Sequence, residues 1–578
     1  MKQTFARLAA CVLLFALAAC QGNPAISEAK ETKATMYFGG DIITMEGDSA
    51  QYAEAVVVKD GKILFVGNKE EAMQAAGDNH DMVDLKGQTL LPGFIDGHGH
   101  LFNAGIQAVA ADLLPPPDGN AKDIVSLIQI TKDWAIKNKT VIEKIGWIIG
   151  FGYDDAQLKE KRHPNANDLD KISTEIPVLL IHQSGHLGAM NQKGLELAGY
   201  TDGVTDPEGG VIRREPGTKK PDGVLEEMGM FIPLFKLIMG KIDAEGSQAI
   251  VRAGIKAYTK YGFTTAQEGR ATRAACETYM RLAESDQLSI DINAYPDIQA
   301  ELAFMKKVGA QPNYKNHFRI GGVKLSLDGS PQGKTAWLSK PYKVPPKGQA
   351  ATYLGYPAIP DETKVVEFVD AAYENNWQIL AHCNGDAAAD QYIRAIRHAS
   401  TKFGNNDRRP IMIHAQTVRE DQLDSMKVLG IIPSFFSMHT FYWGDWHRDE
   451  TLGKERAYRI SPTQSALKRG MLFSEHHDAP VANPDAIRVL AATVNRTSRS
   501  GDVIGPEQRV SPFIGLKSIT DWAAYSTFDE KIKGTLTIGK LADFVILDQN
   551  PLKIDPLKIE TIKVMETIKE GISVYKKQ

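Results

Sequence analysis

The stretch that ends in His98 and His100 carries the residues best suited to chemistry in this sequence. An apolar run precedes these two histidines, and a single glycine separates them. Because side chains alternate between the two faces of a strand, both histidines would point the same way, with Asp96 beside them. Two neutral imidazoles on one face can hold a transition metal ion. Such a pair alone is weak evidence, because most such histidines serve packing, so the prediction depends on further ligands at later strand ends.

Residues of the ligand type do follow later apolar runs. Lys324 and Asp328 share one face of the stretch 319–330. A lysine inside a protein core is costly unless it is paired or modified. Two resolutions stay open for Lys324: a salt bridge to Asp328 or another acid, and carboxylation by CO₂ to an anionic carbamate that could bridge two metals. The other strand ends carry His382, His414 and Asp478.

These residues need a scaffold that brings strand ends together. Between about residue 92 and residue 530, strand patterns alternate with helical ones, which indicates parallel strands joined by crossover helices. About eight such units would close a (β/α)₈ barrel of the TIM type, whose active sites lie at the carboxyl ends of the strands. The predicted fold class is therefore α/β. The predicted strands are Phe94–His100, Val178–His182, Thr264–Glu268, Ile320–Leu327, Gln378–His382, Ile411–His414 and Leu472–His476.

Short strands are predicted at both ends of the chain. Residues 34–91 contain an Asp-Gly hairpin signal, and residues 531–578 contain three more short strand patterns. A small β-sandwich built from both termini would therefore accompany a barrel over 92–530. The stretch within about 113–241 is longer than one strand–helix unit needs, and we expect an insertion there that could cover the mouth of the barrel.

The first residues predict export. Residues 1–19 begin with basic residues and continue with an apolar run too short to span a bilayer, directly before Cys20. This pattern resembles the lipobox of bacterial lipoproteins, in which the cysteine is lipidated; the alternative is an ordinary secretory signal peptide. Residues 20–33 would then form a tether. Because no aspartate follows Cys20, we expect a lipid anchor in the outer membrane, facing the periplasm.

Composition narrows the classes of partner. The formal net charge is -4, and no basic tail or aromatic–basic pattern is present, so nucleic-acid binding is not expected. With Cys20 lipidated, Cys276 and Cys383 alone cannot build a disulfide framework, so stability must come from a large core. The expected partners are a small-molecule substrate and the membrane, and assembly into a homo-oligomer stays open.

Together the motifs resemble the amidohydrolase superfamily and, within it, amidohydrolase family 3, a branch that includes proteins similar to the N-substituted formamide deformylases. The resemblance covers nearly the whole mature chain. Its elements are residues 92–100, Lys324 with 328–330, His382 with 385–386, 414–416, 478–480 and 534–543.

The resemblance implies a hydrolytic metal centre at the mouth of the barrel. Carried over by position, His98 and His100 would bind the more buried metal. His382 and His414 would bind a second metal, and a carboxylated Lys324 would bridge the two. All of these positions are filled here, so a binuclear centre is allowed, and a mononuclear one stays open.

The resemblance also implies the chemistry. Asp478 would lie beside the first metal, accept a proton from the attacking water and return it to the leaving nitrogen. A divalent metal, with zinc as first choice for these ligands, lowers the pKa of bound water from about 15.7 to about 7. The predicted function is hydrolysis of C–N bonds other than ordinary peptide bonds, in amides or N-acyl groups. The alternatives are a cyclic amide or imide hydrolase, and a regulatory or binding lipoprotein without turnover.

Several other residues are candidates for the site. Residues 184–186 read Ser-Gly-His where relatives commonly have Asp-Gly-His, and His186 could contact the substrate or an oxyanion or merely order its loop. Tyr153 and Trp443 are candidate substrate-binding residues, with a purely structural use as the alternative. The histidines 476–477 stand where relatives often have a small residue and a serine, and they could support the site or narrow its pocket.

Overall fold

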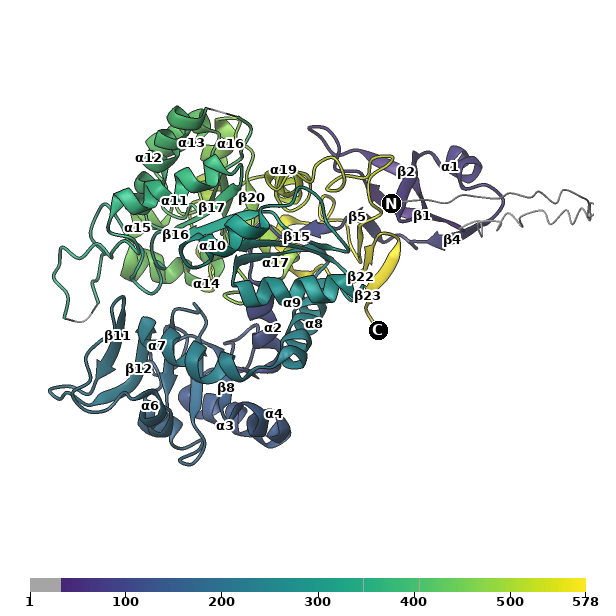
Figure 1. Cartoon of the computed structure of the whole chain (residues 1–578). Coiled ribbons are helices and arrows are strands. Elements are labelled where there is room, and N and C mark those ends of the chain that lie inside the picture. Colours follow the sequence, from purple (N-terminus) through teal and green to yellow (C-terminus); the bar gives the residue numbers. More distant parts are fainter. Residues whose placement is uncertain (1–32, 347, 405) are drawn as a thin grey trace, which may run out of the picture.

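A computed structural model describes residues 33–578 except 347 and 405. This part of the chain contains four β-sheets and the helices that cover them (Figure 1). The predicted signal peptide, and Cys20 with its predicted lipidation, lie outside the described residues. Across the described ranges, no helix combines the length and the apolar character that a membrane crossing requires. Cys276 and Cys383 are both buried and free.

An eight-stranded sheet joins the two ends of the chain. Its order is β23-β22-β21-β5-β1-β2-β3, and β4 pairs with β1. Strand β5 is the junction, since it lies antiparallel to β21 from the C-terminal end and parallel to β1. Asp60 and Gly61 have φ values of 53° and 74° between β2 and β3, as the Asp-Gly signal predicts. The strands are β1 (Ala34–Ile43), β2 (Tyr52–Lys59), β3 (Lys62–Gly67), β4 (His80–Asp84), β5 (Thr89–Pro92), β21 (Phe544–Leu547), β22 (Val564–Lys569) and β23 (Ile572–Lys576).

Two parallel sheets form the centre of the molecule. One has the order β15-β14-β13-β6 and the other β16-β17-β18-β19-β20. Only Gly321 separates β15 from β16, so the chain passes directly from one sheet to the other. The predicted α/β class is thus confirmed. The strands are β6 (Phe94–Ile95), β13 (Phe263–Ala271), β14 (Asp291–Pro296), β15 (Phe318–Ile320), β16 (Gly322–Ser326), β17 (Gln378–Cys383), β18 (Ile411–His414), β19 (Ile432–Phe435) and β20 (Ser474–Glu475).

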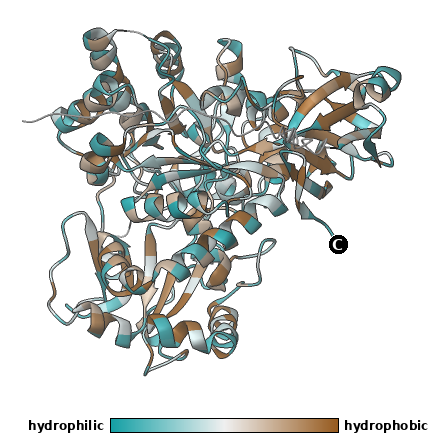
Figure 2. Ribbon diagram, turned by 45° about the vertical axis from the view of Figure 1, so that its right-hand side comes forward, coloured by the Kyte–Doolittle hydropathy of each residue, from teal (hydrophilic) through white to brown (hydrophobic). Residues whose placement is uncertain are grey.

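Helices follow most of these strands and turn their apolar faces inward (Figure 2). Side-chain caps mark where several of them begin. Asp361, for example, accepts a hydrogen bond from the backbone N–H of Thr363 at 3.0 Å, which satisfies a donor that the helix leaves free. The helices are α2 (Leu101–Val109), α8 (Ala244–Lys260), α9 (Arg273–Glu284), α10 (Ile298–Val308), α11 (Glu362–Glu374), α12 (Asp386–Phe403), α13 (Glu420–Leu429) and α17 (Ala486–Asn495).

The long segment between α2 and α8 forms its own lobe, the lower one in Figure 1. Its six-stranded sheet has the order β11-β12-β10-β9-β8-β7. The helices α3 (Ile124–Lys137) and α4 (Lys139–Ile145) belong to the same segment. We call this segment the insertion lobe. Its strands are β7 (Ala111–Asp112), β8 (Ile148–Tyr153), β9 (Val178–His182), β10 (Leu187–Met190), β11 (Gly210–Arg214) and β12 (Pro221–Glu227).

The placement of Val178–His182 among the strands of the central sheets is wrong. This strand is β9 of the insertion lobe, where it pairs antiparallel with β10. A short turn with Gly185 at φ 73° reverses the chain after β9. A crossover helix, which a parallel neighbour requires, therefore does not follow this strand.

The sequence pattern did not predict two of the central strands. Strand β14 reads Asp-Ile-Asn-Ala-Tyr-Pro, and β19 reads Ile-Pro-Ser-Phe. Both carry polar residues and a proline, which are depleted in strands. All of their residues are buried, however, because neighbouring strands pair with them on both sides.

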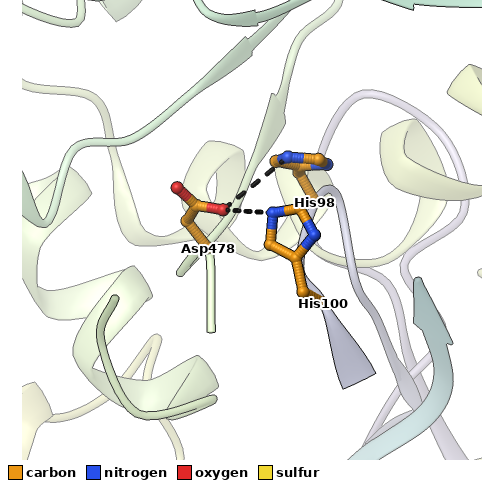
Figure 3. Close-up of side chains that lie close together, drawn as sticks. All are labelled: His98, His100 and Asp478. Carbon is orange, nitrogen blue, oxygen red and sulfur yellow. Dashed lines mark ion pairs between the residues drawn. The ribbon is translucent and has the colours of Figure 1, made fainter. Parts of the chain in front are cut away.

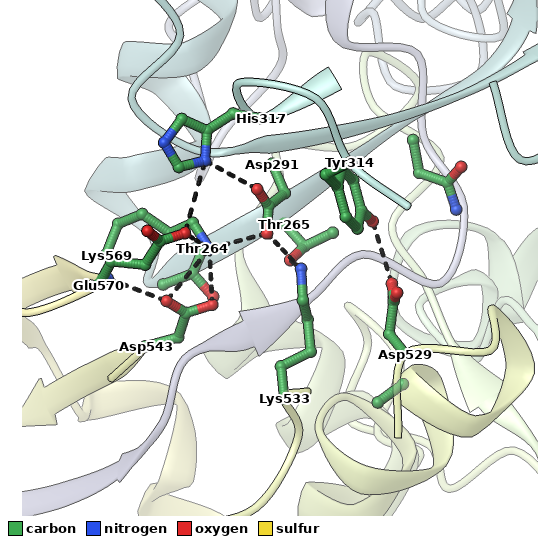
Figure 4. A network of polar contacts seen from close by, with 12 residues as sticks. Thr264, Thr265, Asp291, Tyr314, His317, Asp529, Lys533, Asp543, Lys569 and Glu570 are labelled. Carbon is green, nitrogen blue, oxygen red and sulfur yellow. Dashed lines mark hydrogen bonds and ion pairs between the residues drawn. The ribbon is translucent and has the colours of Figure 1, made fainter. Parts of the chain in front are cut away.

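A buried charge network joins the central four-stranded sheet to the terminal sheet (Figure 4). Asp291 opens β14 and accepts hydrogen bonds from Lys533 and, at 2.7 Å, from Lys569. Lys569 also donates to Asp543 Oδ2 at 2.9 Å. The side chains of both lysines are no more than 2% exposed, so each depends on these carboxylates for its charge balance. His317 contacts Asp291 Oδ1 at 2.8 Å from the other side.

Candidate metal centre

His98 and His100 follow β6, and the local backbone holds both rings toward one point (Figure 3). Asp96 acts as the support, because its carboxylate accepts the backbone N–H groups of His98 at 3.0 Å and of Gln267 at 3.1 Å. A Cβ atom at Gly97 would lie 2.7 Å from the carbonyl oxygen of Glu475, so only glycine allows this close approach. Close packing at this point of the motif therefore requires glycine at position 97.

Asp478 completes the cluster from just beyond the carboxyl end of β20. Its Oδ1 lies 3.2 Å from His100 Nε2 and 3.7 Å from His98 Nε2. The ligand atoms of these three side chains all lie within 4.8 Å of one another, and a metal ion fits such a group. Asp478 Oδ1 is buried and has no hydrogen-bond partner. An orphaned carboxylate oxygen facing two imidazoles matches the donor set of a divalent cation.

Lys324, His382 and His414 lie next to this cluster. The Lys324 amine is 3.0 Å from His98 Nε2, and its residue is only 2% exposed. The rings of His382 and His414 are 4.5 Å apart, and the His414 ring is 5.8 Å from that of His98. His414 Nε2 also lies 3.8 Å from Asp478 Oδ2. All six predicted metal-ligating side chains are thus brought together in one place.

The electrostatics of the site favour uncharged nitrogen ligands. Burial is the main cause that lowers the pKa values of His98 and His414 well below the ordinary value for histidine. Burial likewise lowers the pKa of Lys324 to about 7. Burial raises the pKa of Asp478, but His100, His476 and Lys324 together outweigh it and the pKa is lowered overall. Neutral imidazoles beside an ionised carboxylate are the protonation states that a metal ligand set needs.

The predicted alternative of a salt bridge between Lys324 and Asp328 is not what the structure shows. Asp328 instead accepts hydrogen bonds from Asn384 N at 3.0 Å and Gly385 N at 2.7 Å, and it contacts His382 Nδ1 at 3.1 Å. Its carboxylate is therefore occupied in holding the loop and the ring that follow β17.

Each central histidine has its Nδ1 atom held by a different partner. His98 Nδ1 donates to Gln267 Oε1 at 2.6 Å, and His382 Nδ1 to the Asp328 carboxylate. His414 Nδ1 contacts His476 Nε2 at 3.1 Å. Holding Nδ1 in this way fixes the orientation of each ring and makes Nε2 the nitrogen that can bind a metal, as at metal sites in general. His98 Nε2 lies 3.0 Å from Lys324 Nζ, and His382 Nε2 lies 3.3 Å from Asn384 Nδ2.

The two histidines before Asp478 have distinct positions. The ring of His476, which contacts His414 through Nε2, is itself held by Ser434, since His476 Nδ1 lies 2.9 Å from Ser434 Oγ. His477 lies on the other side, with Nε2 3.3 Å from Asp96 Oδ1. Both are at most 1% exposed, so neither lines an open pocket. They support the side chains around the centre, which favours the first of the two predicted roles.

The insertion lobe places His186 beside the centre. Its ring is 6.3 Å from that of His382, and its Nδ1 is 2.9 Å from Glu227 Oε2. Burial lowers the pKa of His186, but the Glu227 carboxylate more than offsets this and raises it above the ordinary value. Tyr153, in contrast, is fully buried, and its hydroxyl is 3.1 Å from His163 Nδ1, so its role in substrate binding stays a prediction.

A second group of metal-ligand types, Asp154, Asp155 and His182, lies in the insertion lobe. His182 Nε2 is 3.1 Å from Asp155 Oδ1. Ser184 N donates to His182 Nδ1 at 3.0 Å, which leaves the proton on the nitrogen that faces the carboxylates. Trp443 Nε1 donates to Asp154 Oδ2 at 3.0 Å. These bonds satisfy the group without an ion, and they connect the lobe to Trp443, whose contact with the substrate stays a prediction.

Sequence reasoning missed Gln267, Ser434 and Glu227. Gln267 lies 169 positions from the histidine it holds, and Glu227 lies 41 positions from His186. Ser434 is in a strand that the pattern did not predict. Nothing in the local sequence marks these residues, because each gains its role only from the packing of distant strands.

Comparison with known proteins agrees with this geometry. The sequence profile described as the amidohydrolase family matches residues 81–575. YtcJ of Bacillus subtilis is 25% identical over 94% of this chain and 99% of its own length. The N-substituted formamide deformylase of Arthrobacter pascens is 22% identical over 91% of this chain and 95% of its own. A solved structure described as an uncharacterized metal-dependent hydrolase from Pyrococcus furiosus has a TM-score of 0.70 and 25% identity, and the match covers 90% of this chain and all of that one (100%). The chain therefore belongs to the amidohydrolase family and is a metal-dependent hydrolase.

Proposed function

We propose that this protein hydrolyses C–N bonds other than ordinary peptide bonds, in amides or N-acyl groups. The observation that carries the proposal is the convergence of His98, His100 and Asp478, with a buried carboxylate oxygen that has no hydrogen-bond partner. The similarity to an N-substituted formamide deformylase supports the same bond type. Burying so many polar side chains at one point costs free energy unless they bind a ligand or carry out a reaction, which argues against a purely regulatory lipoprotein.

The two central sheets would together form one closed (β/α)₈ barrel. Counting β15 and β16 as one strand gives eight parallel strands. A parallel bridge between Asp297 and Lys324 links β16 to the end of β14. At the opposite edges, Asp478 N donates to His98 O at 3.1 Å and His100 N to Ala479 O at 2.8 Å. In such a barrel the carboxyl ends of the strands share one mouth, where the centre would lie.

The residues present fit one or two zinc ions. His98 and His100 with Asp478 would hold the first ion, and His382 with His414 the second. Lys324 stands between the two groups and would bridge them if carboxylated, since a carbamate supplies two anionic oxygens. When bound, such an ion supplies hydroxide near neutral pH and polarises the scissile carbonyl.

The protein side chains would carry the proton transfers and the orientation of the substrate. Asp478 accepts the proton of the attacking water and later returns it to the leaving nitrogen. His186, held by Glu227 at 2.9 Å, can donate a hydrogen bond to the carbonyl oxygen as negative charge develops on it. The insertion lobe covers the centre on that side and limits access of bulk water.

A direct test combines metal analysis with a substrate panel. Purified protein would be assayed for bound metal and for hydrolysis of formamides, N-acyl amino acids and cyclic amides. We expect bound divalent metal and loss of activity on chelation, with recovery when zinc is returned. Protein without metal, whose hydrolysis no added divalent ion restores, would contradict the proposed function.

Replacing Lys324 with alanine is expected to lower the metal content by at least half and to abolish most activity, because the bridging ligand is gone. Metal content would be measured by mass spectrometry on the purified variant. Adding a short carboxylic acid such as acetate should restore part of the bound metal, since it supplies the missing anionic oxygens. Full metal content and activity in Lys324→Ala would remove the carbamate from the proposal.

His476→Ala is expected to weaken zinc binding about 10- to 100-fold, because His414 loses the partner that fixes its ring. Competition with a chromogenic chelator would measure the affinity. The control is His398→Ala, since the His398 side chain is 51% exposed on α12. Equal affinities of the His476 variant and the wild type would mean that this ring only fills space.

For location, we propose a lipid anchor at Cys20 that holds the enzyme at the outer membrane, facing the periplasm. The support is the lipobox-like pattern and the absence of an aspartate after Cys20. Such an anchor would leave the described part of the chain outside the bilayer.

A further inference from the structure

Arg270 is a cation beside the metal centre to which the proposed mechanism gives no role. It follows Gly269, whose backbone packs directly on the metal-ligand ring: a Cβ atom there would lie 2.2 Å from His98 Cε1. Gly269 N also donates to Gly99 O at 2.8 Å. The start of the Arg270 side chain is therefore fixed one residue away from the centre. That side chain is 45% exposed, so a ligand can reach it.

Asp297 holds Arg270 in place but uses only part of it. Arg270 Nε donates to Asp297 Oδ2 at 2.7 Å. Within the described ranges, no hydrogen bond or ion pair engages its two terminal nitrogens. Asp297 is itself anchored, because it caps α10 through Gln299 N at 2.9 Å and forms a backbone bridge with Lys324. The guanidinium is thus positioned in advance, which reduces the entropic cost of binding an anion.

The surroundings of His186 add an apolar side to the same region. The ring of Phe231 is 6.5 Å from that of His186 and 6.2 Å from that of Phe235. Phe235 is 52% exposed, which is unusual for so large an apolar side chain. Arg270 is also an electrostatic neighbour of His186. A cation and the partly buried ring of Phe231 therefore lie near the same catalytic candidate, and the exposed ring of Phe235 lies next to Phe231.

We propose that Arg270 binds a carboxylate of the substrate, and that the enzyme is selective for anionic amides of the N-acyl amino acid class. The free terminal nitrogens suit a carboxylate because a guanidinium donates to it through two parallel N–H groups. Phe231 and Phe235 would receive an apolar acyl group. Hydrolysis adds the hydroxyl of water to the acyl carbon and its proton to the nitrogen, which releases a carboxylic acid and the amino acid. This inference rests on the proposed function, because it names the substrate class of that same site.

The test compares one N-acyl amino acid with its neutral carboxamide analogue on metal-loaded protein. The variants are Arg270→Gln and Arg270→Lys. Arg273→Gln is the matched control, because Arg273 lies three residues later at the start of α9, is 63% exposed and likewise pairs through Nε with an acid, Glu277, at 2.7 Å. Metal content is measured for each protein, so that loss of the metal cannot imitate loss of substrate binding.

We expect the wild type to prefer the carboxylate substrate. Arg270→Gln should lower kcat/KM for that substrate about 10- to 100-fold, mainly through KM, and change it less than about threefold for the neutral analogue. Arg270→Lys should recover part of the loss, and Arg273→Gln should match the wild type. Equal wild-type rates on both substrates, or an equal loss on both in Arg270→Gln, would overturn the inference while the proposed function stands. If no amide of the wider panel is cleaved, the proposed function fails and the inference fails with it.

Discussion

Asp478→Asn is expected to lower kcat about 100- to 10,000-fold while leaving the protein folded and metal bound. Asparagine keeps one oxygen toward His98 and His100 but has no basic site, so it cannot accept the proton that hydrolysis must move. The substitution preserves size at a position with φ 53°, a backbone conformation that asparagine adopts readily. Steady-state kinetics at saturating zinc, with the metal content measured in parallel, would give the result.

Asp286→Asn is the control for this experiment. It makes the same chemical change on an exposed loop before β14, at nearly the same φ of 53°, and should leave kcat unchanged. If Asp478→Asn retained more than about a tenth of wild-type kcat with full metal content, another base would have to move the proton. His186 is then the next candidate, because it lies beside His382 and its pKa is raised by Glu227 despite burial.

The candidate site could be predicted largely because each ligand lies next to a strong local pattern. His98, His382 and His414 follow apolar strands or lie at their ends, Lys324 lies within one, and parallel strands bring their carboxyl ends to the same side. Alternation along β16 put Lys324 on the inner face, where it contacts His98. The local sequence and the tertiary structure agree here because a strand has only two faces, and the alternation of residue types indicates which face points inward.

The residues that hold these ligands could not be predicted. Gln267 is one glutamine in a strand, and only the register of β13 against β6 brings it to His98. His476 could be named from sequence, but not its partner Ser434, which lies in a strand that begins Ile-Pro. Hydrogen bonds across neighbouring strands depend on register to within one residue, and no local preference encodes that register.

The fold could be predicted where strands alternate with helices along the chain. Where they do not, the sequence pattern was misleading. Val178–His182 has the same apolar character as a central strand, so pattern alone could not separate the two. The turn at Gly185 and the antiparallel pairing with β10 decide its place in the insertion lobe. Strand β14 shows the opposite case, because burial on both sides overrides the poor strand preference of its Asp, Asn and Pro residues.

The charge network around Asp291 depends on one carboxylate (Figure 4). Burial raises the pKa of Asp291, but Lys533 and Lys569 outweigh it and hold the pKa well below the usual range. A depressed pKa stabilises the fold at every pH above the value in the unfolded chain, about 3.9, and this stability is lost only as the pH falls through the folded value. At neutral pH the full contribution is therefore present.

Asp291→Asn should consequently cost about 3–5 kcal/mol of unfolding free energy at pH 7, because it leaves the buried Lys533 ammonium without its carboxylate partner, while Lys569 keeps only Asp543 and Glu570. Denaturation by urea would measure the loss, with Asp286→Asn as the exposed control. Adding Lys533→Met to Asp291→Asn removes one of the unpaired charges and should restore part of the stability, whereas two independent effects would simply add. A loss below about 1 kcal/mol in Asp291→Asn would mean that water or a shift of the lysines replaces the carboxylate. Activity below the unfolding temperature should stay near that of the wild type, since this network joins the sheets and does not touch the metal ligands.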